Sequence, residues 1–136
     1  MDILIVEDDT ALLAQLKETL EGLALATASA RTAELGLTLI ESDQHPIILL
    51  TDINLGDGMN GLDLASLLAQ RRPALVTIFI SGETHWMQQR PLNIRERFIR
   101  KPFRSAHLFN AIRELEGLLG REQLAVVDGS SAYALV

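Results

Sequence analysis

Five polar residues of this chain directly end or follow short apolar runs that read as β-strands. They are Glu7, Asp8, Asp52, Ser81 and Lys101. In an open parallel sheet the carboxyl ends of all strands lie along one edge, and ligands bind there. We therefore predict that three acids, one hydroxyl and one ammonium group meet at a single edge of a sheet.

Carboxylates held this close repel one another unless some are protonated or a hard cation neutralises them. Mg²⁺ fits best, because it takes oxygen ligands and binds through one or two carboxylates together with a phosphate. We expect Asp8 and Asp52 to be direct ligands, Glu7 to act through water, and the backbone carbonyl of Asn54 to complete the set. With the charge partly neutralised, a carboxylate oxygen of Asp52 can attack an incoming phosphorus atom and form an aspartyl phosphate.

Lys101 and Ser81 have roles in the same reaction. The ammonium can pair with one phosphoryl oxygen and the hydroxyl can hydrogen-bond to another, and backbone groups at Asn54 and Gly82 can complete the cradle. Each residue alone has an ordinary explanation: a turn serine, a solvated lysine, or a helix cap in the case of Asp9. The five together at successive strand ends favour a phosphoryl-transfer site.

The elements that would position these residues alternate strand and helix, which predicts an α/β fold with a mainly parallel sheet. The expected strands are residues 3–6, 23–28, 47–50, 76–80 and 98–100. The first expected helix has Asp9 or Thr10 as its N-cap and ends at Gly22. The other expected helices span residues 32–41, 62–70 and 105–119. The weakly hydrophobic second strand is expected at a sheet edge, and the continuous branched run 47–50 at the centre.

The composition of the chain excludes several classes of function. The chain has 136 residues, no cysteine and a formal net charge of −6. The charge argues against direct nucleic-acid binding, and no leader or apolar stretch of spanning length is seen, so a cytoplasmic protein without membrane contact is expected. We expect one domain over residues 1–120, with residues 121–136 as a tail, linker or pairing segment.

Four motifs, ILIVEDD, ILLTDINL, TIFISGE and FIRKPF, resemble in their order and spacing the receiver domain of two-component response regulators. The resemblance covers about residues 1–119. It implies a flavodoxin-like, doubly wound five-stranded parallel sheet of order 2-1-3-4-5 with about five helices. It also implies that a sensor histidine kinase or a histidine phosphotransfer protein donates the phosphoryl group to Asp52 from a phosphohistidine. Ser81 and Lys101 match the switch hydroxyl and lysine of the family, and Phe98 falls at its aromatic switch position, although a core aromatic is the competing interpretation.

The chain departs from the family pattern in two places. Gly56 stands where many members carry proline, which should loosen that loop. Residues 83–97 include Trp86 and Pro91 and lack the usual small-residue motif, so the fourth helix should be short or irregular. That puts the usual output surface in doubt. The signal is expected to leave through a downstream protein partner, through self-association or through a further part of a longer chain.

Two rival functions use the same residues. A haloacid dehalogenase-type phosphohydrolase also has a strand-end aspartate, magnesium, a hydroxyl and a lysine, but it generally places a second aspartate where this chain has Asn54. A receiver-like interaction module that no longer accepts phosphate is the other. The presence of every acceptor-site residue counts against that module.

Overall fold

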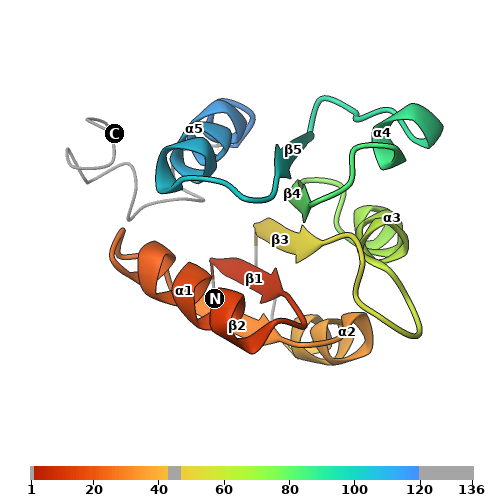
Figure 1. The fold of residues 1–136 in the computed structure, drawn as a ribbon, viewed down its shortest axis with the longest axis horizontal. Coiled ribbons are helices and arrows are strands. Elements are labelled where there is room, and N and C mark those ends of the chain that lie inside the picture. Colours follow the sequence, from red (N-terminus) through yellow and green to blue (C-terminus); the bar gives the residue numbers. More distant parts are fainter. Residues whose placement is uncertain (1, 43–46, 120–136) are drawn as a thin grey trace.

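The computed structural model describes residues 2–42 and 47–119, which form a five-stranded parallel sheet of order β2-β1-β3-β4-β5 (Figure 1). The elements in chain order are β1 (Ile3–Val6), α1 (Thr10–Glu21), β2 (Thr27–Ala30), α2 (Ala33–Glu41), β3 (Ile48–Asp52), α3 (Gly61–Arg71), β4 (Val76–Ser81), α4 (Trp86–Gln89), β5 (Glu96–Arg100) and α5 (Ser105–Glu116). The strand order and the five helices confirm the fold that the resemblance implied. The predicted tail, residues 121–136, lies outside the described residues.

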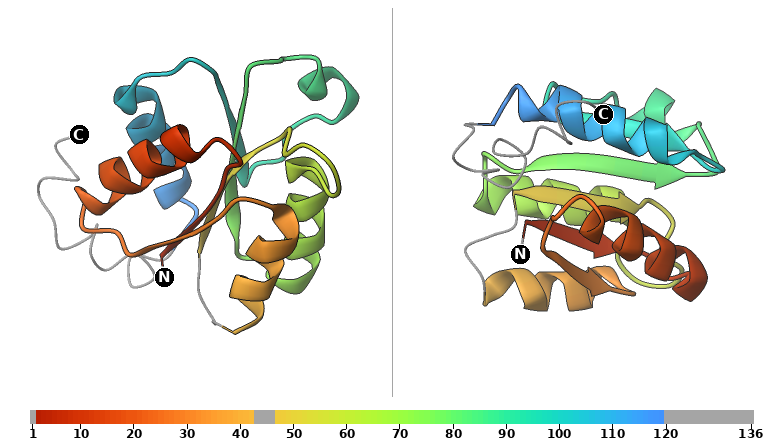
Figure 2. Two further views of the ribbon diagram at one scale, coloured as in Figure 1. Left: turned by 60° about the horizontal axis from the view of Figure 1, so that its bottom comes forward. Right: turned by 90° about the vertical axis from the view of Figure 1, so that its left-hand side faces the viewer.

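Helices cover both faces of the sheet, with α1 and α5 on one face and α2 and α3 on the other (Figure 2). Alternate side chains of the central strands supply the two cores: Ile5 and Leu50 pack with α1 and α5, whereas Leu4 and Leu49 pack with α2 and α3. Every residue of β1, β3 and β4 is buried. Their continuous apolar sequences are what two covered faces require.

No helix in the described ranges combines the length and the apolarity that crossing a bilayer requires.

Polar side chains fix the starts of the first three helices. Asp9 accepts hydrogen bonds from the amides of Ala11 and Leu12 at 3.0 and 3.1 Å, which confirms it as the N-cap of α1. Thr32 and Asn60 cap α2 and α3 in the same way. Each cap satisfies backbone donors that the first helical turn leaves free. The strand-to-helix loops at the site edge are therefore anchored at their helical ends.

The predicted boundaries of the second strand and of the last helix were wrong, and the fifth strand begins at Glu96 rather than at Phe98. The second strand is Thr27–Ala30 rather than 23–28, because Leu23 and Leu25 belong to the turn that ends α1, and the strand register with β1 begins at Thr27. Their hydrophobicity reflects packing on the α1 face, where Leu25 is buried. Helix α5 ends at Glu116 with Gly117 as its C-cap, earlier than the predicted end at 119. The strand does lie at the sheet edge, as its composition indicated.

The segment after β4 has the irregular form that its sequence predicted. Helix α4 is only four residues long. The chain then returns to β5 through a paired contact in which the Arg90 guanidinium donates to both carboxylate oxygens of Glu96, at 3.0 and 2.7 Å. Glu96 is buried, and Arg90 also lies over the Phe79 ring, 5.3 Å from its centroid. A bidentate pair of this kind fixes geometry more firmly than a single ion pair, so it closes the segment in place of a longer helix.

The contact between α3 and the end of β3 depends on the absence of a side chain at Gly61. Its amide donates to the Ile53 carbonyl oxygen at 2.8 Å. A Cβ atom at residue 61 would overlap the carbonyl oxygen of Asp52 and lie 3.0 Å from the Ile53 Cα. The start of α3 thus presses directly on the backbone that carries Asp52.

Replacing Gly61 with alanine should therefore lower the free energy of unfolding by about 2 kcal/mol, the usual cost of overpacking a tight backbone contact. Urea denaturation measures this. Gly117→Ala is the matched control, because its backbone is helical and the new Cβ would meet the Glu114 carbonyl oxygen at an ordinary 3.6 Å. Equal stability of the two variants would contradict the close contact.

Candidate functional site

Three carboxylates converge where β1 and β3 end. Oxygen atoms of Glu7, Asp8 and Asp52 all lie within 4.8 Å of one another. Glu7 and Asp52 are buried, whereas Asp8 is exposed. The strand register explains the convergence, because β1 and β3 are hydrogen-bonded neighbours and Val6 pairs with Thr51. The residue that follows each of these partners is an acid of the cluster.

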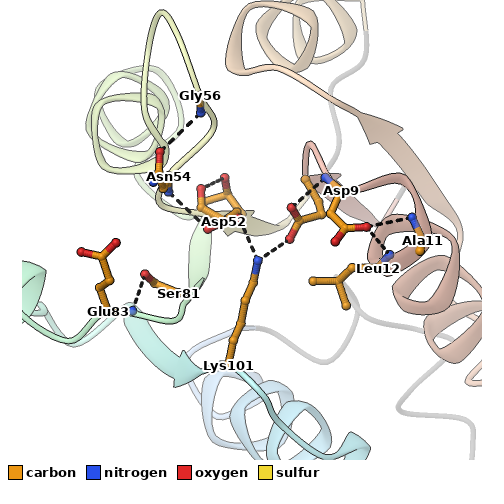
Figure 3. A network of polar contacts seen from close by, with 11 residues as sticks. Asp9, Ala11, Leu12, Asp52, Asn54, Gly56, Ser81, Glu83 and Lys101 are labelled. Atoms are coloured by element: carbon orange, nitrogen blue, oxygen red, sulfur yellow. Dashed lines mark hydrogen bonds and ion pairs between the residues drawn. The ribbon is translucent and has the colours of Figure 1, made fainter.

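Lys101 supplies the positive charge of this edge. Its Nζ donates to Oε1 of Glu7 at 2.9 Å and to Oδ2 of Asp52 at 2.8 Å, so the ammonium bridges the two buried carboxylates (Figure 3). The Lys101 backbone amide donates to the Ser81 carbonyl oxygen at 2.8 Å, which ties the end of β5 to the end of β4. Four of the predicted residues are thus joined through one lysine and its backbone.

Burial changes how these groups titrate. Removal of the Glu7 carboxylate from water raises its pKa from 4.5 to about 7, and hydrogen bonds from Lys101 and from the Asp9 amide oppose the rise only in part. Burial acts in the opposite direction on the ammonium, but its bonds to Asp52 and Glu7 outweigh that effect and raise the pKa of Lys101. The lysine is therefore firmly charged, while Glu7 holds its proton readily.

The loop after β3 contacts the second oxygen of Asp52. The Asn54 amide donates to Oδ1 of Asp52 at 3.2 Å, and the Asn54 side-chain oxygen accepts from the Gly56 amide at 3.4 Å (Figure 3). Both Asp52 oxygens are therefore oriented, one by the lysine and one by a backbone amide. The carboxylate cannot turn freely, which is what a positioned nucleophile or metal ligand requires.

Ser81 lies at the end of β4, next in sequence to Ile80, the strand partner of Asp52. Its hydroxyl oxygen accepts the Glu83 amide at 3.1 Å and so stabilises the turn that follows (Figure 3). The structure thus brings Ser81 to the predicted edge while its described hydrogen bond is to the turn rather than to Asp52. Phe98 is half-buried and packs on the α2 and α3 face with Trp86 and Met87, which suits either a core or a switch role.

The donor set fits Mg²⁺. All three converging acids offer oxygen atoms, and the exposed Asp8 leaves the cluster open to solvent on one side. Mg²⁺ prefers such carboxylate oxygens and keeps several of its own waters, which an open edge accommodates. The assignment of Asp8, Asp52 and the Asn54 carbonyl as ligands, with Glu7 acting through water, stays a prediction.

Sequence reasoning missed two contributors to this geometry. Gly61 was part of a turn-rich stretch, and nothing in the sequence indicated that its missing side chain admits α3 against Asp52. Asp9 was expected only as a helix cap, yet its amide also donates to Oε2 of Glu7 at 3.1 Å. The only sequence signal for the bond between the Asp9 amide and Glu7 was the predicted N-cap role of Asp9, because a cap fixes the backbone around it.

Comparisons with known proteins agree with one another. A family model described as the response regulator receiver domain matches residues 3–113. The chain is 31% identical over 80 residues to the photosynthetic apparatus regulatory protein RegA of Rhodobacter capsulatus, covering 59% of this chain and 42% of that protein. It is 32% identical over 117 residues to the positive alginate biosynthesis regulatory protein of Pseudomonas aeruginosa, covering 84% of this chain and 46% of that protein. It therefore spans less than half the length of these curated relatives.

Among solved structures, a CheY-like response regulator receiver domain protein from Methanospirillum hungatei is 31% identical, with a TM-score of 0.74 over 86% of this chain and 94% of that one.

The raised pKa of Glu7 makes a pH-dependent contribution to stability in the absence of divalent metal. Below about pH 4.5 the carboxyl is protonated in both states; between about 4.5 and 7 only the folded state keeps the proton, so stability falls as pH rises through this window. Glu7→Gln mimics the protonated form and removes this term. With EDTA present, the free energy of unfolding of the variant minus that of wild type should therefore increase from pH 4.5 to 7.

Glu41→Gln is the control for this pH series, because Glu41 is exposed and lies in a surface ion pair with Arg71. Denaturant titrations at each pH supply the measurement. A difference between Glu7→Gln and wild type that is flat across the window would contradict the assigned cost of ionising Glu7.

Proposed function

Because this chain belongs to the response regulator receiver family, we propose that Asp52 accepts a phosphoryl group from a phosphohistidine of a sensor histidine kinase or a histidine phosphotransfer protein. The observation that carries the proposal is the meeting of Glu7, Asp8 and Asp52 at one sheet edge, with the Lys101 ammonium bridging Glu7 and Asp52. Three acids alone would also suit a structural cation. The added lysine and the oriented Asp52 carboxylate suit phosphoryl transfer.

In the proposed step, a carboxylate oxygen of Asp52 attacks phosphorus as the bond from phosphorus to the donor imidazole nitrogen breaks. The new bond is an acyl phosphate, and the imidazole leaves with its electron pair and is protonated. The Asn54 amide and Lys101 hold Asp52 in a fixed orientation for this attack. Bound Mg²⁺ would supply charge neutralisation of the phosphoryl oxygens, held by Asp8, Asp52 and the Asn54 carbonyl with Glu7 through water.

After transfer, Lys101 and Ser81 have phosphoryl oxygens as new partners. The ammonium moves from Asp52 to a phosphoryl oxygen, and the Ser81 hydroxyl leaves the Glu83 amide to donate to another. The Glu83 turn is then released, and Phe98 turns inward as the switch aromatic. Support comes from the backbone hydrogen bond that already joins these two residues, from the Lys101 amide to the Ser81 carbonyl oxygen.

We place this function in a receiver domain over residues 1–120, with 121–136 as a tail or linker, in a cytoplasmic protein. The chain is a signalling domain rather than a turnover enzyme, and we propose that it assists its own phosphorylation and dephosphorylation. The relatives are named as regulatory proteins more than twice as long as their matched parts. A downstream protein partner or self-association is the proposed route of output.

The phosphohydrolase alternative is disfavoured by the family match and by Asn54, which cannot donate and reclaim a proton as a second aspartate would. An inert receiver-like module is disfavoured because the three carboxylates converge and the lysine bonds to Glu7 and Asp52.

Intact protein treated with acetyl phosphate and Mg²⁺ should gain the mass of one phosphate, and hydroxylamine should remove it, because acyl phosphates react with this nucleophile. Intact-mass spectrometry measures both. Asp52→Asn should show no gain, while Asp63→Asn, an exposed acid in the first turn of α3, should behave as wild type. No labile gain on wild type would favour the inert module, and continuous release of phosphate over many turnovers would favour the hydrolase.

Lys101→Ala should remain folded with Mg²⁺ present but should not transmit the phosphorylated state. Trp86 is the only tryptophan and lies between the Ser81 turn and β5, so its emission reports on this region. Beryllofluoride, which mimics an acyl phosphate, should change the emission of wild type and leave that of Lys101→Ala nearly unchanged.

The control for this experiment is Lys17→Ala, which removes the other lysine of the chain from an exposed pair with Glu21 on α1. It should respond to beryllofluoride as wild type does. An equal emission change in Lys101→Ala and wild type would show that the lysine has no part in the switch.

A further inference from the structure

The loop between β3 and α3 carries Asn54 and is rich in glycine. Gly56 and Gly58 both have positive φ, at 79° and 89°, a conformation that other residues rarely adopt. The two ends of the loop are joined by the bond from the Gly61 amide to the Ile53 carbonyl oxygen. Such a loop loses much backbone freedom on ordering, so its middle needs a partner from elsewhere in the protein.

Helix α2 provides that partner through Glu34. Oε2 of Glu34 accepts the Met59 amide at 3.1 Å, across 25 positions of sequence. A Cβ at Gly58 would lie 3.1 Å from the same oxygen, so the carboxylate sits directly against the loop backbone. Within residues 2–42 and 47–119, this is the one hydrogen bond that joins the backbone of residues 55–59 to another helix or strand.

The held loop lies beside the acidic cluster. A Cβ at Gly56 would be 3.9 Å from Oδ2 of Asp8, and the Asn54 amide contacts Asp52 at the root of the loop. A shift of this loop would therefore change both the space beside Asp8 and the direction of the Asn54 carbonyl. The proposed metal site therefore depends on the position of this loop.

We propose that Glu34 is a positioning residue, which clamps the loop of residues 54–60 against α2 and so sets the affinity of the acidic cluster for Mg²⁺. This inference rests on the proposed function, because it deepens the account of the same site. Glu34 touches neither the carboxylates nor the phosphoryl group. It acts through the backbone of Met59, as supporting residues around metal sites commonly do.

A purely structural role for Glu34 predicts something different. As an acid in the first turn of α2, it also interacts favourably with the positive end of the helix. Loss of that interaction would lower stability without altering the loop. Glutamine separates the two roles, since its amide oxygen can still accept the Met59 amide while its charge is gone.

The test compares Glu34→Ala, Glu34→Gln and Glu41→Ala, the last removing an acid from the far end of α2 where its partner is Arg71. Amide hydrogen exchange at Met59 in EDTA and calorimetric titration with Mg²⁺ are the measurements. Glu34→Ala should exchange faster at Met59 and bind Mg²⁺ roughly three- to tenfold more weakly, the equivalent of one net hydrogen bond. Glu34→Gln and Glu41→Ala should match wild type within about twofold on the same scale.

If Glu34→Ala showed the same Met59 exchange rate and the same Mg²⁺ affinity as wild type, the inference about Glu34 would be overturned and the proposed function would stand. A Glu34→Gln variant as weak as Glu34→Ala would also overturn the inference, because charge at the helix end would then be the cause. If wild type itself bound no Mg²⁺ and took up no phosphate from acetyl phosphate, the proposed function would fail and this inference with it.

Discussion

The bridge that the Lys101 ammonium makes between Glu7 and Asp52 is the interaction on which the acidic site depends most. Two buried carboxylates beside a third would otherwise repel one another at an edge that water reaches only in part. The lysine offsets that repulsion, and burial adds its share by favouring the protonated form of Glu7. In the proposed function the same ammonium exchanges Asp52 for a phosphoryl oxygen, so the group that stabilises the resting site would also sense phosphorylation.

The parallel sheet holds the charged groups of this site in place through the rigidity of its central strands. Central strands buried on both faces fix their carboxyl ends, and the residues just beyond those ends inherit that precision. The loops contribute adaptability, but each is held at a specific point: Asp9 caps α1 beside Glu7, Gly61 presses on the Asp52 backbone, and Glu34 holds the glycine-rich loop. Rigid strands with individually tethered loops are the usual way in which an α/β fold carries a site.

The region beyond Ser81 differs in character from the acceptor site. The four-residue helix α4 has the short form that its sequence predicted, and the pair between Arg90 and the buried Glu96 closes this segment. Trp86 packs there with its indole nitrogen buried and without a partner in the described part of the chain. An unpaired buried donor is costly, so an alternative packing that satisfies it competes more easily with the resting one. The proposed acceptor site is thus joined to a segment with its own local structure.

The sequence by itself determined the layered fold, the strand order through its family motifs, and the meeting of Glu7, Asp8, Asp52, Ser81 and Lys101 at one edge of the sheet. Hydrophobic periodicity located the strands, and the position of each polar residue at a strand end placed it at the site, because the carboxyl ends of parallel strands lie along one edge of the sheet. Only the tertiary structure decided how these groups pair: that Lys101 bridges two acids, that the Ser81 hydroxyl binds its own turn, and that Glu34 reaches Met59. Those contacts join residues distant in sequence across elements whose relative placement is set by packing. Local patterns carry no record of such packing, and for the same reason the hydrophobic turn at Leu23 was mistaken for a strand.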